Sequence, residues 1–364
     1  MDWRLTFHVS DSNKEISTVE KILSTPASTT PILVGSFYEI FPDHLGNHYR
    51  LFRKYGDAIK TTNMGKTTYL TDSPKVAAMP LAESAYMTKK INENHPLWGV
   101  KDNTAIFIGD TETETWRLAH KFLPPAMGPK AVRHYTPLMQ ECVRKSFAVF
   151  DEHDSRDQSW NVYQYMEKLA SQTIGKFSLD TDFQHFYARR CPFASYRDEP
   201  CKPAFPQQED YCSWRVVSTS PLRLHNASFQ PGRTTKTEVV LPGGYRLPAD
   251  SVIVPALYAI HTDPEVWRDP FCFNPGRWTS DEVKTKHRCA YIPFATGPRG
   301  CIGFNFALLE VKILLSELVS RYEFFREGLD AVEYDPEFQL IRPLNLYVRA
   351  KKRAGVAYEE LEVY

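Results

Sequence analysis

The chain has 364 residues with equal numbers of acidic and basic side chains, and its 26 prolines and 13% aromatic residues are typical of a globular protein with many ordered loops. The zero net charge gives no reason to expect a nucleic acid or another polyanion as a partner. The seven cysteines show neither a CxxC pair nor zinc-type spacing, and their odd number suits reduced thiols in the cytosol.

The first thirty residues are polar and rich in serine and threonine, and we expect them to be irregular. Charged residues begin at the second position, and no apolar run there approaches the length of a membrane span, so the sequence predicts no transmembrane anchor. The expected location is cytoplasmic, or peripheral on the endoplasmic reticulum membrane through a surface patch. A start site placed too late in the chain would give the same pattern.

Two early segments have clear secondary-structure patterns. Leu45, Tyr49 and Phe52 recur at helical spacing, and Gly56 is placed to end that helix. Residues 58–69 then predict a β-hairpin.

The next helix follows an acidic run at residues 110–114, where negative charge is favoured, and is expected to stop at Pro124-Pro125. Within it Trp116 and His120 are four residues apart and therefore project from one face. Taken alone, such a pair is more often an ordinary surface or core pair than part of a ligand site.

Two further helices are predicted, one from Pro129 to Phe147 and one over residues 166–177, and core packing explains both. Residues 186–220 contain many prolines and no sustained apolar period, which predicts an irregular junction. Residues 239–260 then predict β structure, and residues 344–348 predict a terminal strand.

One thiol, Cys301, lies where a glycine-rich loop meets an apolar helix predicted over residues 304–322. The unpaired N–H groups and the positive dipole end of such a helix favour a thiolate, which is either a nucleophile or a metal ligand. The alternative is a buried structural cysteine beside turn glycines. No zinc-ligand cluster and no motif-level histidine accompanies Cys301, which argues against a zinc site and a cysteine hydrolase.

The spacing Phe-x-x-Gly-x-Arg-x-Cys-x-Gly, filled by Phe294, Gly297, Arg299, Cys301 and Gly303, resembles the haem-binding motif of the cytochrome P-450 (haem-thiolate) monooxygenases. The resemblance implies that Cys301 is the proximal ligand of haem b (iron protoporphyrin IX), whose thiolate pushes electron density toward O–O cleavage. It covers roughly residues 30–185 and 221–350. It is strongest toward fungal members and toward soluble, reductase-fused fatty-acid hydroxylases.

The same resemblance implies how the haem would be held. Four side chains from three parts of the chain would bind the propionates: Trp116, His120, Arg233 and Arg299. Phe294 would shield the sulfur, and Gly297 and Gly303 would let backbone N–H groups approach it. No catalytic residue is identified beyond the haem ligand Cys301.

The sequence departs from the family's pattern near Arg223. The family motif Glu-x-x-Arg would place a glutamate three residues earlier, but Ser220 stands there, and Pro221 is expected to disturb the helix that bears the motif. Arg277 matches the second arginine of the same ion-pair network, so two cations lack their carboxylate. Either another acid substitutes, or this region folds poorly.

The predicted fold is therefore the cytochrome P-450 fold, mainly α with small β-sheets, in a single domain over residues 1–364. It lacks much of the central helical block and its acid–threonine pair, because residues 186–220 offer no counterpart. The implied reaction inserts one oxygen atom of O2 into a small organic substrate, in secondary metabolism by likeness to fungal relatives, with electrons from a separate NADPH-dependent reductase. Two alternatives stay open: a haem-binding but catalytically defective remnant, and a mis-spliced gene model of an active monooxygenase.

Overall fold

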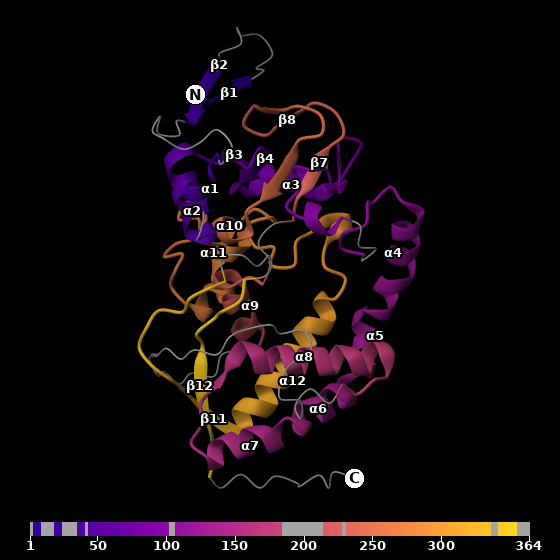
Figure 1. Ribbon diagram of the computed structural model, residues 1–364, viewed down its shortest axis with the longest axis vertical. Helices are drawn as coiled ribbons and strands as arrows, with labels where there is room; N and C mark the ends of the chain where they lie inside the picture. Colours follow the sequence, from indigo (N-terminus) through magenta and orange to yellow (C-terminus); the bar gives the residue numbers. More distant parts are fainter. Residues whose placement is uncertain are drawn as a thin grey trace. The chain divides into compact units, whose positions relative to one another are not determined.

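The computed structural model describes residues 3–8, 18–23, 35–40, 43–101, 106–183, 214–227, 231–335 and 341–354. The chain divides into two compact units, whose elements are labelled in Figure 1. The first unit comprises Met1–Pro125, Arg215–Ile302 and Pro336–Ile341. The second comprises Ala126–Trp214, Gly303–Asp335 and Arg342–Tyr364.

The first unit contains two sheets, and helices pack on the larger one. Its strands are β1 (Trp3–His8), β2 (Thr18–Leu23), β3 (Ala58–Asn63), β4 (Lys66–Thr71), β5 (Met87–Thr88), β7 (Arg233–Thr235), β8 (Val239–Leu241), β9 (Tyr245–Leu247) and β10 (Val252–Pro255). Its helices are α1 (Phe37–Ile40), α2 (His44–Tyr55), α3 (Pro74–Ala82), α4 (Glu114–Ala126), α9 (Trp214–Leu224), α10 (Leu257–Thr262) and α11 (Asp281–Lys284), with the 3-10 turns η1 (Trp98–Val100), η2 (Pro275–Thr279) and η3 (Gly297–Arg299).

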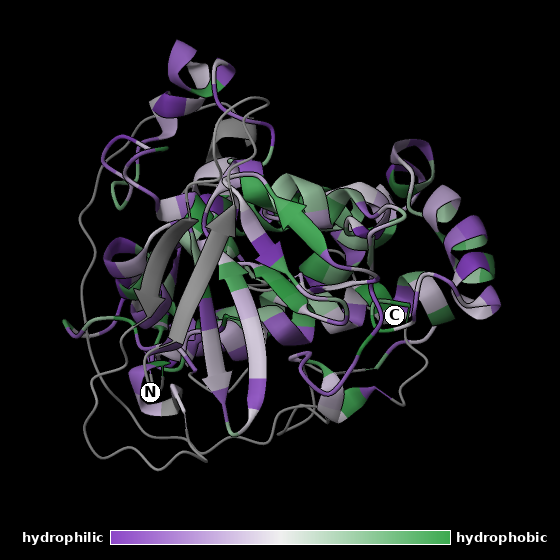
Figure 2. Cartoon of the chain, turned by 90° about the horizontal axis from the view of Figure 1, so that it is seen from above, coloured by the Kyte–Doolittle hydropathy of each residue, from purple (hydrophilic) through white to green (hydrophobic). Residues whose placement is uncertain are grey.

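The larger sheet has the strand order β3-β4-β10-β7-β5, and its central strand β10 is buried along its whole length. Val252 and Val254 pack in one cluster with α2, whereas Ile253 packs on the opposite face with side chains of α3 and β8. A strand covered on both faces is expected to be continuously apolar, and Figure 2 shows such strands beside others of mixed character. The antiparallel pairing of Ile253 with Arg233 places this arginine inside the buried sheet.

The smaller sheet, β2-β1-β9-β8, corrects the expectation that the first thirty residues are irregular. β1 and β2 form an antiparallel pair, and β1 joins β9 where Phe7 lies opposite Tyr245. The two strands carry aromatic and β-branched residues in short alternating runs. The serine-rich sequence between the two strands concealed this pattern.

Several predictions of single elements are confirmed in the first unit. Helix α2 ends at Gly56, whose φ of +95° is accessible to glycine, and β3 and β4 form the predicted hairpin. The predicted stop of α4 is wrong by one residue, because Pro124 and Pro125 stay helical in its last turn. Proline can adopt the helical φ, and in the last turn few residues remain whose helical hydrogen bonds it could disturb.

Two further predictions in the first unit are partly wrong. The β structure predicted over residues 239–260 is confirmed as β8, β9 and β10, but its end is wrong, because residues 257–260 belong to the helix α10 and a short apolar run suits either structure. Helix α9 forms although Pro221 lies inside it, and it includes residues 214–220 of the predicted irregular junction. The rest of that junction lies outside the described residues.

The second unit is helical, with one small sheet. Its helices are α5 (Pro129–His134), α6 (Thr136–Lys145), α7 (Phe147–Ser155), α8 (Val162–Leu179) and α12 (Phe304–Arg321), and its strands are β6 (Trp160–Asn161), β11 (Tyr322–Arg326) and β12 (Tyr347–Lys352). The helix predicted from Pro129 to Phe147 is broken into three pieces, since Thr136-Pro137 begins a new helix and Ser146 ends it. The helices predicted at 166–177 and 304–322 are confirmed as α8 and α12, and the terminal strand lies three residues later than predicted.

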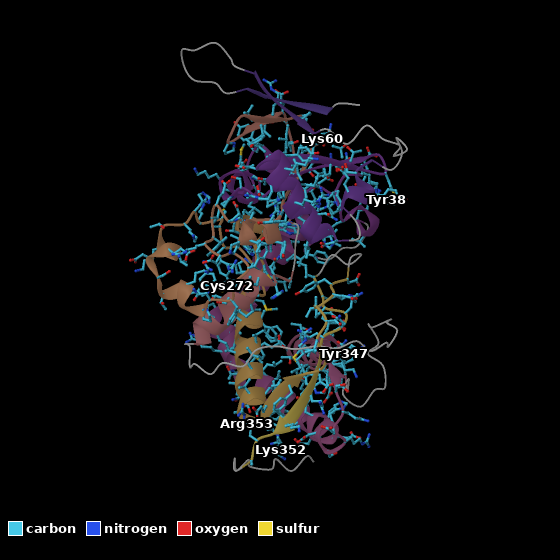
Figure 3. The ribbon with its side chains drawn as sticks, turned by 90° about the vertical axis from the view of Figure 1, so that its left-hand side faces the viewer. Tyr38, Lys60, Cys272, Tyr347, Lys352 and Arg353 are labelled. Carbon is cyan, nitrogen blue, oxygen red and sulfur yellow. The ribbon has the colours of Figure 1, made fainter. Side chains whose placement is uncertain are left out.

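An aromatic cluster forms the core of the second unit. Phe150, Trp160 and Tyr322 are each at most 4% exposed, and the ring centroids of Phe150 lie 4.8 Å from Trp160 and 5.9 Å from Tyr322. Figure 3 shows Lys352 and Arg353 at the end of β12, where Arg353 Nε donates to the carbonyl of Val319 at 2.9 Å. No helix in the described parts of the chain is long and apolar enough to cross a membrane.

Candidate functional site

Cys301 lies at the end of a tightly turned loop in the first unit. The Cys301 N–H donates to the carbonyl of Phe294 at 2.9 Å, and the Ala295 N–H donates to that of Ile292 at 2.9 Å. The thiol residue is exposed, and helix α12 begins three residues later, after Gly303. The predicted placement of Cys301 between a glycine-containing loop and a long helix is confirmed.

Gly297 is required by the path of this loop. Its φ is +78°, and a Cβ added there would lie 2.0 Å from the carbonyl oxygen of Leu81 at the end of α3. A left-handed conformation and a backbone approach this close leave room for glycine alone. Gly303 has an ordinary φ of −86°, and Phe294 is half-buried. Their predicted roles beside the sulfur stay predictions.

Arg299 fastens the loop to the segment that precedes α4. Its Nη2 donates to the carbonyls of Gly109 at 2.7 Å and Phe107 at 3.3 Å, and its guanidinium lies 4.5 Å from the centroid of the Trp116 ring. Burial lowers the pKa of Arg299 to about 10, and the nearby charge of Arg233 acts in the same direction.

Trp116 and His120 project from one face of α4, as their spacing predicted, and their rings stack with centroids 4.4 Å apart. Trp116 is the buried residue of α4. Its indole N–H donates to the carbonyl of Ile106 at 3.1 Å. In this structure the Trp116 ring therefore packs against the Arg299 guanidinium, while its N–H bonds the segment that precedes α4.

Arg233 is 1% exposed and forms an ion pair with Glu83, with 2.9 Å between Nε and Oε1. Its Nη1 donates to the carbonyl of Gly232 at 2.9 Å. Its Nη2 is buried and has no hydrogen-bond partner among the residues that the structure describes. A buried guanidinium nitrogen without an acceptor is costly, so this atom indicates a place for an anion.

Lys89 and Glu83 belong to the same cluster and were missed from the sequence. Lys89 is 9% exposed, and within the described ranges no hydrogen bond or ion pair joins its ammonium. Burial, with Arg233 and Arg299 close by, lowers the pKa of Lys89 to about 7. The pairing of Thr88 with Thr234 brings Lys89 beside Arg233, and no local sequence pattern predicts that pairing.

We call Lys89, Arg233 and Arg299 the open cluster. Three cations share one buried carboxylate, Glu83, whose other oxygen accepts the Thr111 hydroxyl at 2.9 Å. The open cluster therefore suits a ligand that carries carboxylates. The loop of Cys301 is attached to it through Arg299, which brings an exposed thiol and a cluster of cations into one unit.

Comparisons with known proteins show which proteins the chain resembles. A family model described as Cytochrome P450 matches residues 221–348. The chain is 33% identical over 502 positions to cytochrome P450 monooxygenase alnD of Emericella nidulans, covering 96% of this chain and 90% of that protein. It is 39% identical over 143 residues to cytochrome P450 4c21 of Blattella germanica, covering 38% of this chain and 28% of that protein.

Solved structures show the same similarity in the fold. A mutant of the P450DA haem domain covers 90% of this chain and 97% of its own, with a TM-score of 0.76 and 17% identity. The cytochrome P450 CYP102L1 covers 85% of this chain and 98% of its own, with a TM-score of 0.72 and 15% identity. The predicted fold class, mainly α with small β-sheets, is confirmed by these structures.

Proposed function

The chain belongs to the cytochrome P450 monooxygenase family, and from that premise we propose that it binds haem b through Cys301 and inserts one oxygen atom of O2 into a small organic substrate. The observation that carries the proposal is the open cluster, in which Lys89 and Arg233 Nη2 have no acceptor within the described residues. Haem b presents two carboxylates and an iron that accepts one thiolate. The residues of the first unit offer matching groups for both.

Each residue of the site then has a defined task. Cys301 would hold the iron as its thiolate, and Arg233 and Lys89 would neutralise the propionates. Arg299 fixes the loop through the carbonyls of Gly109 and Phe107 and adds positive charge. When bound, the haem iron supplies the redox chemistry with O2.

The remaining predicted haem contacts form part of the same proposal. We propose that the stacked rings of Trp116 and His120 lie beside the propionates and that the His120 nitrogens contact them. The Trp116 N–H is not assigned this contact, because it already donates to the carbonyl of Ile106. Phe294 would shield the sulfur, and Gly303 would let a backbone N–H approach it. No residue is assigned to proton delivery on the oxygen-binding side.

We also propose a separate NADPH-dependent reductase as electron donor, and a cytoplasmic place or a peripheral one on the endoplasmic reticulum. A role in secondary metabolism is supported by the likeness to a fungal monooxygenase.

A second candidate is a haem-binding protein that has lost turnover, or an incorrectly spliced form of an active enzyme. The alignment with the Emericella protein extends over 502 positions, more than the 364 residues of this chain, so that relative has residues with no counterpart here. Sequencing the transcript across the codons for residues 186–220 tests the splicing explanation directly.

The absorption spectrum of the reduced protein with carbon monoxide tests the proposal. We expect the long-wavelength Soret band of a thiolate-ligated haem, and we expect Cys301→Ala to remove it. Cys272→Ala is the matched control, because Cys272 is the other exposed thiol of the first unit. No haem uptake by the 364-residue protein would contradict both haem hypotheses. Haem uptake with a competent reductase and no substrate oxidation would favour the non-catalytic candidate.

A further inference from the structure

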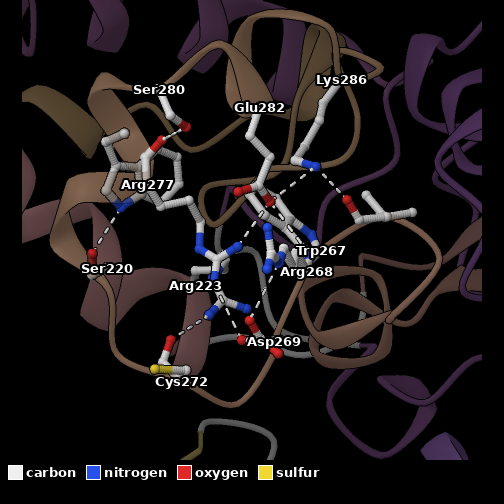
Figure 4. A network of polar contacts seen from close by, with 12 residues as sticks. Ser220, Arg223, Trp267, Arg268, Asp269, Cys272, Arg277, Ser280, Glu282 and Lys286 are labelled. Carbon is white, nitrogen blue, oxygen red and sulfur yellow. Dashed lines mark hydrogen bonds and ion pairs between the residues drawn. The ribbon is translucent and has the colours of Figure 1, made fainter.

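A second group of cations lies around Trp267 in the first unit (Figure 4). Arg223 and Arg277 are 2% and 4% exposed, and their guanidiniums lie 5.3 Å and 6.0 Å from the centroid of the buried Trp267 ring. The ammonium of Lys286 lies 4.8 Å from the same ring. We call Arg223, Arg277 and Lys286 the closed cluster. The aromatic face attracts all three cations but removes none of their charge.

The carboxylate in contact with this cluster comes from helix α11. Glu282 Oε1 accepts from Arg277 Nη1 at 2.8 Å and lies 3.3 Å from the Lys286 ammonium. Although burial raises the pKa of Glu282, the contacts with Arg277 and Lys286 bring it below its ordinary value. Glu282 is therefore ionised at neutral pH and balances part of the cluster's charge.

Position 220, one turn before Arg223 on α9, contributes no charge. The Ser220 hydroxyl accepts from the indole N–H of Trp278 at 2.7 Å. Arg223 donates instead to backbone carbonyls, that of His261 at 2.7 Å and that of Cys272 at 3.3 Å. The sequence left two explanations for the missing glutamate, and the contact of Glu282 with Arg277 favours the substitution of another acid.

Hydrogen bonds lead from the closed cluster to the loop of Cys301. The His261 carbonyl accepts from Arg223, and the His261 ring accepts the Ile292 N–H at 3.0 Å. Ile292 and Phe294 then accept the N–H groups of Ala295 and Cys301, each at 2.9 Å. The start of the thiol loop is therefore attached to the residue that Arg223 holds.

A second connection passes through η2. Trp278 follows Arg277 directly, and its ring centroid lies 4.5 Å from that of Tyr291. The Tyr291 hydroxyl donates to the carbonyl of Thr219 on α9 at 3.2 Å. A shift of Arg277 would therefore reach the residue next to Ile292.

We propose that Glu282 is a positioning residue, which supplies from α11 the carboxylate that position 220 lacks and so holds the segment from which the Cys301 loop departs. The proposal rests on the proposed function, because this loop is the one that would bind the haem iron. Glu282 acts through Arg277 and does not itself contact the thiol.

The first test compares Glu282→Gln with Asp281→Asn, an exposed neighbour on α11 that pairs with Lys284. In the haem-free chain, we expect Glu282→Gln to lower the folded-to-unfolded equilibrium constant about tenfold, less than for a fully buried pair because Glu282 is partly exposed. We expect the alkylation rate of Cys301, followed by peptide mass spectrometry, to change severalfold, because this exposed thiol reacts at a rate that depends on how its loop is held. Asp281→Asn should change neither quantity.

The outcomes separate this proposal from the proposed function. If Cys301 reacts at the wild-type rate in Glu282→Gln, the positioning role is overturned even where stability falls. If the wild-type chain takes up no haem, the proposed function fails, while the alkylation rate still decides the role of Glu282. With haem bound, Glu282→Gln should reduce the thiolate-ligated fraction of the ferrous–CO spectrum.

The second test restores a carboxylate at the other position. Residues three apart on a helix share a face, so Ser220→Glu places a carboxylate beside Arg223. We expect the double variant Ser220→Glu/Glu282→Gln to recover most of the stability and the wild-type Cys301 alkylation rate that Glu282→Gln loses. A double variant no better than Glu282→Gln would overturn the equivalence of the two positions.

Discussion

The open and closed clusters contain the same number of cations and one contacting carboxylate each, yet they differ in how their donors are satisfied. In the closed cluster the guanidiniums donate to Glu282 and to backbone carbonyls, and among described residues Arg277 Nε is the buried nitrogen left over. In the open cluster the whole ammonium of Lys89 and Arg233 Nη2 lack acceptors within that same part of the chain.

Under the proposed function, unpartnered donors, and not an excess of positive charge, distinguish the proposed ligand site from the structural network. A cluster satisfied by protein groups affects folding whether or not a ligand is present. A cluster with free donors becomes favourable only when an anion arrives. Variants of the two clusters should therefore separate stability of the haem-free chain from haem binding.

The largest effect is expected from Trp267→Leu in the closed cluster. Trp267 is fully buried and its indole N–H donates to the carbonyl of Ile260 at 3.2 Å. Its loss should lower the unfolding free energy of the haem-free chain by about 3 kcal/mol, in line with large-to-small core substitutions. Urea denaturation measures this, and Trp98→Leu in η1, a half-buried tryptophan, should cost much less. If the loss of unfolding free energy appeared only with added haem, the closed cluster would not be the one that stabilises the haem-free chain.

The next effect concerns the link between the Cys301 loop and the open cluster. Gly297→Ala should destabilise the haem-free chain by roughly 2–3 kcal/mol, because the new methyl meets the Leu81 carbonyl and φ is positive. Gly65→Ala is the matched control, since Gly65 has nearly the same φ, +79°, and nothing within 4 Å of the added methyl. Equal losses in the two variants would show that the close approach to Leu81 has no energetic weight.

The sequence predicted the parts of the fold that local patterns encode. The hairpin of β3 and β4, the glycine end of α2 and the helices α8 and α12 follow from periodicity and turn residues. Helix α10 was missed because a short apolar run suits both kinds of structure. The β1–β2 pair was missed because its short strands flank a serine-rich stretch.

The site residues likewise divide into those that a local sequence pattern indicates and those that it does not. Cys301, Gly297 and Arg299 are close in sequence, so one motif could indicate them. Lys89 and Glu282 come from distant segments, and their neighbours are set by strand pairing and by the packing around Trp267. No spacing in a single sequence encodes such contacts. The loss of the glutamate at position 220 was visible, whereas its replacement was not.

Arg233→Gln tests the open cluster directly. Two effects are expected: haem affinity falls roughly tenfold to a hundredfold, and the haem-free chain is destabilised because Glu83 is left buried and unpaired. Titration of the haem-free protein, followed by Soret absorbance, measures the first effect, and urea denaturation measures the second.

A second substitution separates these two effects. Glu83→Gln added to Arg233→Gln should restore part of the stability, since neither member of this ion pair is then left buried without the other, but it should not restore haem affinity. Arg246→Gln, which loses an exposed pair with Glu238, should change neither quantity. Recovery of haem affinity in the double variant would show that the propionates do not need Arg233.

The smallest effect is a dependence on pH carried by Lys89. Folding lowers the pKa of Lys89 from 10.5 to about 7, so between these values the unfolded chain binds one proton more than the folded chain. The unfolding free energy of the haem-free protein should therefore rise with pH in this window, by at most ~1.4 kcal/mol per pH unit from this group. The groups facing Lys89 are Arg233 and Arg299, which oppose its charge, and Glu83, which favours it.

Lys89→Met removes the titrating group, so the difference between wild type and variant isolates its slope from all other titrations. Urea denaturation at pH 7, 8 and 9 measures that difference, and Lys90→Met, an exposed neighbour paired with Asp250, should leave the slope unchanged. Bound haem should flatten the wild-type slope, because a propionate beside Lys89 keeps the ammonium charged in the folded state. An equally steep slope with haem bound would mean that Lys89 faces no carboxylate of the ligand, and the open cluster would then lose its assignment as the propionate site.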